Sequence, residues 1–154
     1  MDIILLRHAH AEAGSDDLAR RLTAKGRKQA AAAAGFLQTR LPAHARVWAS
    51  QAVRSRQTAA CLHPYYRILP ALNPDIDPRS LPPLLAALPD HSCTVLVGHQ
   101  PWLGQLCAFL LTQSWDGYTN WAVEKGAFWW FHLHWQDGLP FAELKLVGRG
   151  FQAA

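Results

Sequence analysis

Strand-like and helix-like patterns alternate along this chain, and the alternation restricts its fold more than any other feature. Short apolar runs indicate strands at Asp2–Leu6, Arg46–Ala49, Tyr66–Leu69 and Thr94–Val97. Helical patterns lie between or after them at Thr23–Leu41, Ala52–Leu62, Leu81–Leu88 and Pro101–Leu111. Thr23 and Ser50 are the expected start signals of the first two helices.

The end of the chain has a different pattern. Phe128–Trp135 and Phe141–Val147 alternate polar and apolar residues on either side of Gln136-Asp137-Gly138, as the strands of a hairpin do. The whole order predicts an α/β fold: a three-layer α/β/α arrangement with a mostly parallel sheet, an antiparallel edge and a C-terminal hairpin. With 154 residues, half of them hydrophobic, the chain can form one ordinary core, so we expect a single domain over residues 1–154.

Charge and hydrophobicity restrict the partners and the location. The 15 basic residues outnumber the 11 acidic ones, but they form only short clusters such as Arg20-Arg21 and Arg54-Arg56. Nucleic-acid binding requires a denser basic stripe or a reader motif, so we expect no nucleic-acid partner. Asp2 stands where a signal peptide carries positive charge, and no apolar segment approaches the ~18 residues of a membrane span. We therefore expect a cytoplasmic protein with no membrane partner.

Two of the predicted strands end in histidine. Leu5-Leu6 leads into Arg7-His8, and Leu96-Val97 leads through a glycine into His99. Ligands of open α/β sheets collect outside the carboxyl ends of the strands, so we expect both histidines at one edge, around one pocket. The connection from Arg7 to Leu22 is unusually long and begins at this site, which predicts that it folds over the pocket.

These residue types suit phosphoryl transfer. A neutral imidazole can attack phosphorus near neutral pH without a metal or another cofactor. Arginines offer forked donors that match phosphoryl oxygens, so Arg7 and Arg54 are the candidate phosphate clamp. Arg54 lies early in its helix, where a helix N-terminus and a guanidinium can face the same anion. We expect His99 to donate a hydrogen bond to an equatorial oxygen.

Three segments carry a family resemblance, and they come in the family's order. These segments are Leu6-Arg7-His8-Ala9, the run from Ser50 to Thr58, and Val97-Gly98-His99-Gln100-Pro101. They resemble the histidine phosphatase superfamily. Within it the chain is similar to the small SixA-type phosphohistidine phosphatases. The features that carry this likeness are the short length, Glu12, the Asp17-x-x-Arg20-x-Leu22-Thr23-x-x-Gly26 segment and Lys125-Gly126-Ala127.

The resemblance implies a role for each matching residue. His8 is the implied phosphoryl acceptor, Arg7 and Arg54 are the implied phosphate clamp, and His99 is the second histidine of the pocket. Asp17 matches an acidic position of the SixA-type branch. Two roles stay open for it, a catalytic carboxylate and an exposed carboxylate of the loop.

The implied substrate is a phosphohistidine on a signalling or phosphotransfer protein. Mutases and broad phosphomonoesterases of the superfamily carry a glutamate general acid in an insertion, whereas residues 70–83 contain no strong proton donor. Alkoxide leaving groups need that donor, which contributes ~10²–10⁴ in rate. A phosphohistidine protonated on its remote ring nitrogen leaves as neutral imidazole, so the missing acid favours a P–N substrate. We expect a monomer or a weak dimer.

Three alternatives remain open. The first is a small-molecule phosphomonoesterase of the same superfamily. The second is a metal-dependent hydrolase that uses His8 and His10, although strand-end His-x-His hydrolases use a barrel of ~250 residues. The third is a non-catalytic phosphate-binding domain, which would have no need of a nucleophile.

Overall fold

The structure is a computed structural model of the chain and describes residues 1–116 and 121–149. Its strands are β1 Asp2–Arg7, β2 Arg46–Ala49, β3 Arg67–Ile68, β4 Cys93–Gly98, β5 Phe128–Gln136 and β6 Leu139–Gly148. Its α-helices are α1 Ala24–Gln38, α2 Val53–Leu62, α3 Leu81–Ala86 and α4 Trp102–Thr112. Short 3-10 helices lie at Asp17–Ala19, Pro70–Leu72 and Pro78–Ser80.

The strands form one sheet in the order β3-β2-β4-β1-β5-β6. The first four in this order are parallel to one another, whereas β5 pairs antiparallel with both β1 and β6. Asp137 and Gly138 form the turn between β5 and β6 with positive φ angles of 53° and 77°, as a tight hairpin turn requires. The predicted fold class is confirmed, including the antiparallel edge and the C-terminal hairpin.

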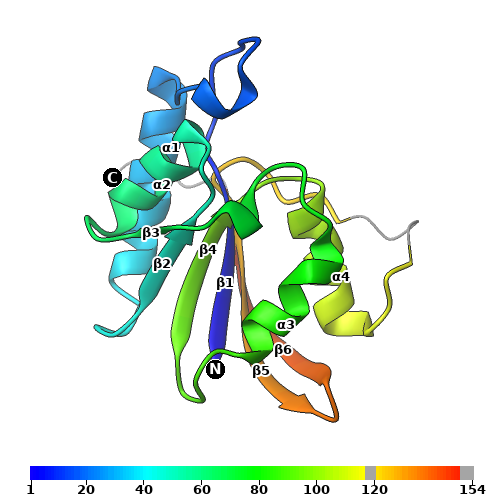
Figure 1. Cartoon of the computed structure of the whole chain (residues 1–154). Coiled ribbons are helices and arrows are strands. Elements are labelled where there is room, and N and C mark those ends of the chain that lie inside the picture. The colour runs from blue at the N-terminus through cyan, green and yellow to red at the C-terminus, as the bar shows by residue number, and fades with distance from the viewer. Residues whose placement is uncertain (117–120, 150–154) are drawn as a thin grey trace.

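Successive residues of the central strands face opposite sides of the sheet, and this produces two hydrophobic layers. Ile4 and Leu6 of β1 pack with α1 and α2, whereas Ile3 and Leu5 pack with α3 and α4. Figure 1 shows these two pairs of helices on opposite faces of the sheet. Because both faces are covered, β1 and β4 are almost continuously apolar, as buried parallel strands are.

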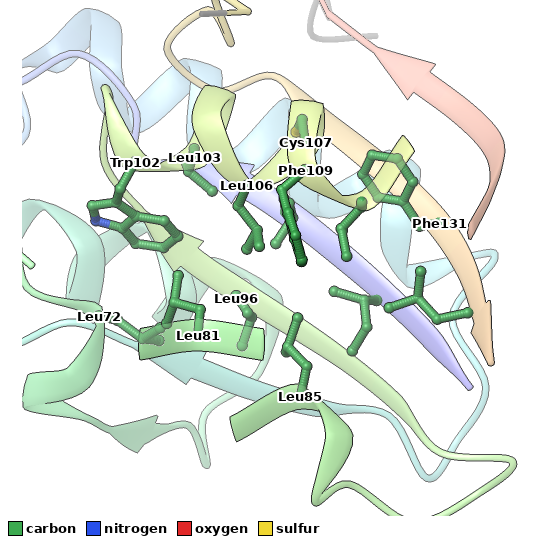
Figure 2. Close-up of a cluster of buried hydrophobic side chains, with 14 of the residues drawn as sticks. Leu72, Leu81, Leu85, Leu96, Trp102, Leu103, Leu106, Cys107, Phe109 and Phe131 are labelled. Carbon is green, nitrogen blue, oxygen red and sulfur yellow. The ribbon is translucent and has the colours of Figure 1, made fainter. Parts of the chain in front are cut away.

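The layer under α3 and α4 contains Trp102, which is 1% exposed. Figure 2 shows its indole ring near Leu72 and Leu81, with the other α4 side chains along the sheet. A Cβ on Gly98 would overlap that ring, so the glycine before His99 gives Trp102 the room to pack. The packing of α4 therefore reaches the residue next to a candidate catalytic histidine.

All four predicted helices are present, and their boundaries differ from the sequence prediction by one to three residues. Thr23 caps α1 as predicted, because its Oγ1 accepts a hydrogen bond from the Gly26 amide at 3.0 Å. That helix ends at Gln38 rather than Leu41, since proline disfavours a helical residue directly before it and Pro42 follows Leu41. The predicted start residue of α2 was wrong: the N-cap is Ala52, whose amide donates to Ser50 Oγ at 3.2 Å, and the Ser50 hydroxyl also bonds a histidine.

Four strands extend beyond the prediction, β2 matches it, and β3 is shorter than the predicted Tyr66–Leu69. β6 begins at Leu139 rather than Phe141 and thus contains Pro140. This is possible because β6 is an edge strand, where a missing N–H costs no ladder hydrogen bond. In the part of the chain that the structure describes, no helix is long and apolar enough to cross a membrane.

Candidate active site

The carboxyl ends of β1 and β4 lie side by side and bring the two histidines together. Arg7 pairs with Gly98 in the parallel register, and the His8 amide donates to the Gly98 carbonyl at 3.1 Å. The His8 and His99 ring centroids are 5.0 Å apart. A cavity of about 300 Å³ opens here, and its lining includes Arg7, His8, Asp17, Arg20, Arg54, His99 and Lys125. All five predicted site residues therefore line one pocket, and their catalytic roles remain predictions.

His8 is held in one orientation by the backbone that follows it. Its Nδ1 lies 2.7 Å from the Ala9 carbonyl oxygen, which can only accept. Nδ1 therefore carries the ring proton, and Nε2 is unprotonated. Thr58 in turn fixes Ala9, because its Oγ1 accepts from the Ala9 amide at 3.2 Å. Burial, together with the cationic Arg54 and Arg7, lowers the pKa of His8 to about 3. The ring is therefore neutral at physiological pH.

Arg54 bridges the two histidines from the first turn of α2. Its Nε donates to His8 Nε2 and its Nη2 contacts His99 Nδ1, both at 3.3 Å. The side chain is only 3% exposed. Burial of a permanently charged guanidinium requires partners, and Asp17 supplies them: its backbone carbonyl accepts from Nη1 at 2.6 Å and its carboxylate from Nη2 at 3.0 Å.

Asp17 therefore acts on Arg54 in this structure. The carboxylate also accepts from Arg20, whose Nη2 lies 2.9 Å away, and the side chain of Asp17 is 54% exposed. Burial raises the pKa of this carboxyl, but hydrogen bonds from Arg54 and Arg20 outweigh that effect and lower the pKa overall. An ionised carboxylate with a lowered pKa is a poor general acid, so the geometry favours a positioning role over proton donation.

Two serine hydroxyls hold the other side of His99. Ser50 Oγ is 2.7 Å and Ser55 Oγ is 3.2 Å from His99 Nε2, and both serines are fully buried. A guanidinium can only donate, so the Arg54 contact makes His99 Nδ1 an acceptor and places the ring proton on Nε2, toward the serines. Burial, followed by electrostatic interaction with His8 and with the cationic Arg54, lowers the pKa of His99 well below its usual range.

This tautomer changes the role expected for His99. The sequence predicts a hydrogen-bond donor to a phosphoryl oxygen, whereas Nδ1 of the neutral ring faces Arg54 as an acceptor. His99 can donate from Nδ1 only after that atom has gained a proton. The physical reason for the difference is the pair of serine hydroxyls, which bind the opposite ring nitrogen.

The sequence did not assign several residues that the structure brings to this site. Lys125 lines the pocket because the Gly126 amide donates to the Arg7 carbonyl at 3.1 Å. Arg20 donates to the Glu12 carbonyl at 3.1 Å, which anchors the long connection, and it also lines the pocket. Ser50 lies in the segment from Ser50 to Thr58 that resembles the family, but nothing in that segment indicates a hydrogen bond between its hydroxyl and His99. The long connection contributes Asp17 and Arg20 to the pocket wall.

The metal-site alternative required His8 and His10 to act together. Only His8 lines the pocket, whereas His10 Nδ1 lies 2.8 Å from Thr23 Oγ1 at the start of α1. Within residues 1–116 and 121–149, no three His, Cys, Asp or Glu side chains form a group that could hold a metal ion. The structure thus gives this pair of histidines no common ligand position.

Comparison with known proteins identifies the family. The profile of the histidine phosphatase superfamily (branch 1) matches residues 3–81, which is more than half of the chain and contains Arg7, His8 and Arg54. The chain belongs to the histidine phosphatase superfamily. This membership supports a phosphatase, and no curated protein sequence matches the chain closely.

Solved structures of this superfamily match nearly the whole chain. The SixA structure from Nakamurella multipartitia, named provisionally as a phosphohistidine phosphatase, is 28% identical, with a TM-score of 0.78 and coverage of 96% of this chain and 95% of that one. A protein histidine phosphatase SixA complexed with tungstate is 24% identical, with a TM-score of 0.78 and 96% of each chain covered. A mycobacterial glucosyl-3-phosphoglycerate phosphatase is 18% identical, with a TM-score of 0.72 and 99% of each chain covered. The last two structures are less than 25% identical to this chain, so these likenesses concern the fold. The predicted resemblance to the SixA-type branch is confirmed.

Proposed function

We propose that this protein is a phosphohistidine phosphatase, which moves the phosphoryl group of a protein histidine first to His8 and then to water. The observation that carries the proposal is the orientation of His8. Its Nδ1–H is held by the Ala9 carbonyl, and its unprotonated Nε2 faces a pocket lined by three arginines, of which Arg7 and Arg54 are the proposed clamp. A neutral, oriented imidazole beside fixed cations is suited to attack a phosphoryl group.

The first step exchanges one P–N bond for another. The lone pair of His8 Nε2 forms the new bond to phosphorus, and the electron pair of the breaking bond returns to the substrate imidazole. Arg7 and Arg54 neutralise the phosphoryl oxygens. The substrate imidazole leaves as a neutral group when its other ring nitrogen carries a proton. The lowered pKa of Asp17 is compatible with this step, because no protein acid is required.

The second step releases phosphate from His8. Because Nδ1–H remains on the Ala9 carbonyl, phospho-His8 keeps its remote proton and leaves phosphorus as a neutral imidazole when water attacks. The attacking water must lose a proton. We assign this proton to His99 Nδ1, which is an acceptor in the ligand-free tautomer, because the anionic phosphoryl group in the pocket opposes the burial and the cationic charges that lower the pKa of this ring.

The decisive experiment traps the intermediate. Wild-type protein, His8→Asn and His10→Asn are mixed, in chelator, with a phosphotransfer protein phosphorylated on histidine, and with an aryl phosphate. We expect release of phosphate from phosphohistidine by the wild type and by His10→Asn, and none by His8→Asn. Mass spectrometry after a rapid quench should find an acid-labile phosphoryl group on His8. His10→Asn is the matched control, because His10 lies outside the pocket lining.

Each other outcome favours a specific alternative. A strong preference for the aryl phosphate would replace the proposal with a small-molecule phosphomonoesterase. Activity that disappears in chelator would favour the metal-dependent hydrolase. Binding of inorganic phosphate without turnover of either substrate would favour the phosphate-binding domain.

A further inference from the structure

A second hollow lies beside the phosphate pocket, on the exposed side of α2. It has a volume of about 300 Å³ and is lined by Arg21, Val53, Arg56, Gln57, Ala60 and Tyr66. Residues that are neighbours in the sequence line the two hollows. Arg20 and Arg54 line the phosphate pocket, whereas Arg21 and Val53 line the second hollow. We name this second hollow the α2 groove. Asp17 contacts Arg54 and the Leu22 amide contacts Gln57, so the segment from Asp17 to Leu22 follows α2 from one hollow to the other.

Two cations of the α2 groove have no anionic partner among the residues that the structure describes. Arg21 and Arg56 are exposed, and neither guanidinium forms an ion pair or a side-chain hydrogen bond with any residue that the structure describes. Glu12 lies near Arg21, since its amide donates to the Arg21 carbonyl at 2.8 Å, but no ion pair joins their side chains. By contrast, Arg20 and Arg54 are both paired with Asp17. The free guanidiniums of the groove are suited to carboxylates.

The floor of the α2 groove is held in place before any ligand binds. The Leu22 amide donates to Gln57 Oε1 at 2.8 Å, and Leu22 is 1% exposed, so the segment that carries Arg21 is fixed against α2. Val53, Ala60 and Tyr66 add apolar surface to the lining of the groove. A preformed groove lined by apolar side chains and two arginines fits an extended or helical segment that carries both carboxylates and apolar side chains.

We propose that the α2 groove docks an acidic segment of the phosphoprotein substrate, next to its phosphohistidine. This proposal rests on the proposed function, because it places the phosphohistidine in the pocket. The pocket of about 300 Å³ has room for a phosphorylated side chain, so a ligand that also reaches Arg21 and Arg56 is larger than a single phosphorylated residue. The groove then selects substrates by the charge around the histidine and leaves the chemistry to the pocket.

The test uses peptides of equal length that carry one phosphohistidine flanked by Glu, by Gln or by Lys, together with free phosphohistidine. We expect the wild type to show a KM about tenfold lower for the Glu-flanked than for the Gln-flanked peptide, with similar kcat. The double variant Arg21→Glu/Arg56→Glu should lose this preference and favour the Lys-flanked peptide. Its kcat/KM for free phosphohistidine should stay within about twofold of the wild type, because the phosphate pocket is unchanged.

A matched control separates docking from net charge. Arg40→Glu/Arg46→Glu makes the same change in charge just after α1 and at the start of β2, away from the strand ends that form the pocket. This variant should keep the wild-type preference, and Arg21→Lys/Arg56→Lys should keep most of it. Equal KM values for the wild type, a preference that survives in Arg21→Glu/Arg56→Glu, or an equal loss in the control would overturn the docking proposal. If the wild type hydrolyses no phosphohistidine at all, the proposed function itself fails.

Discussion

At the scale of single residues, the site depends on which ring nitrogen carries the proton. His8 Nε2 is unprotonated because Ala9 holds Nδ1–H, and His99 Nδ1 is unprotonated because Ser50 and Ser55 hold Nε2–H. Arg54 donates to both unprotonated nitrogens. Both histidines thus present lone pairs to the same pocket. This arrangement suits a nucleophile and a proton acceptor, and it gives Ser50 a positioning role that acts through His99.

Replacing Ser50 with alanine tests that role. The change removes the 2.7 Å partner of His99 Nε2 and leaves Ser55 at 3.2 Å. We expect kcat to fall by about fivefold, which corresponds to about 1 kcal/mol for one buried hydrogen bond, with little change in KM. Because His99 is assigned to the second step, the fraction of enzyme trapped as phospho-His8 at steady state should rise. Rapid-quench mass spectrometry measures this fraction.

Ser92→Ala is the control for the loss of a buried serine. Ser92 is 8% exposed, lies before β4, and its Oγ has no hydrogen-bond partner among the described residues. This variant should keep both kcat and the trapped fraction. A Ser50→Ala enzyme with a lower trapped fraction, or with a loss in KM alone, would contradict the assignment of His99 to the hydrolytic step.

At the scale of elements, the fit of β4 to α4 depends on Gly98. A Cβ at this position would overlap the indole of Trp102, whereas a Cβ on Gly35, in the exposed middle of α1, would meet no atom within 4 Å. We expect Gly98→Ala to lower the free energy of unfolding by about 1–3 kcal/mol. Gly35→Ala should raise it by about 0.5–1 kcal/mol, since alanine loses less conformational freedom in a helix. Urea unfolding of both variants checks the opposite signs.

The elements also show what the sequence can and cannot predict. Apolar runs that end in histidine place His8 and His99 at one sheet edge, because parallel strands share their carboxyl ends. The partner of Ser50 was not predictable, since a hydroxyl before a helix has the same sequence pattern whether it caps the helix or bonds a histidine 49 residues away. Likewise, Lys125 reaches the pocket through a backbone bond between Gly126 and Arg7, which no local pattern records.

At the scale of the whole molecule, the buried histidines make stability depend on pH. Burial lowers the pKa of both His8 and His99, so the folded protein resists their protonation while the unfolded chain takes up protons below the ordinary pKa of 6.5. The unfolded state then binds more protons than the folded state. The free energy of unfolding therefore falls as the pH falls below 6.5, by up to about 1.4 kcal/mol per pH unit for each histidine.

Urea unfolding at pH 6.5, 5.5 and 4.5 measures this dependence. The pKa values of Asp2 and Asp17 are lowered in the folded protein from their ordinary value of 3.8, and the lowest pH of this window lies above 3.8. Protonation of these carboxylates therefore contributes little to the change in the free energy of unfolding within the window. We expect a continuous loss of stability across the window and about half the slope in His8→Asn, which retains only His99 as a buried histidine of the pocket. Equal free energies of unfolding at pH 6.5 and 4.5 would show that the histidines gain protons over the same pH range in the folded protein as in the unfolded chain. Burial would then not lower their pKa values, and the argument that the pocket keeps His8 unprotonated would fail.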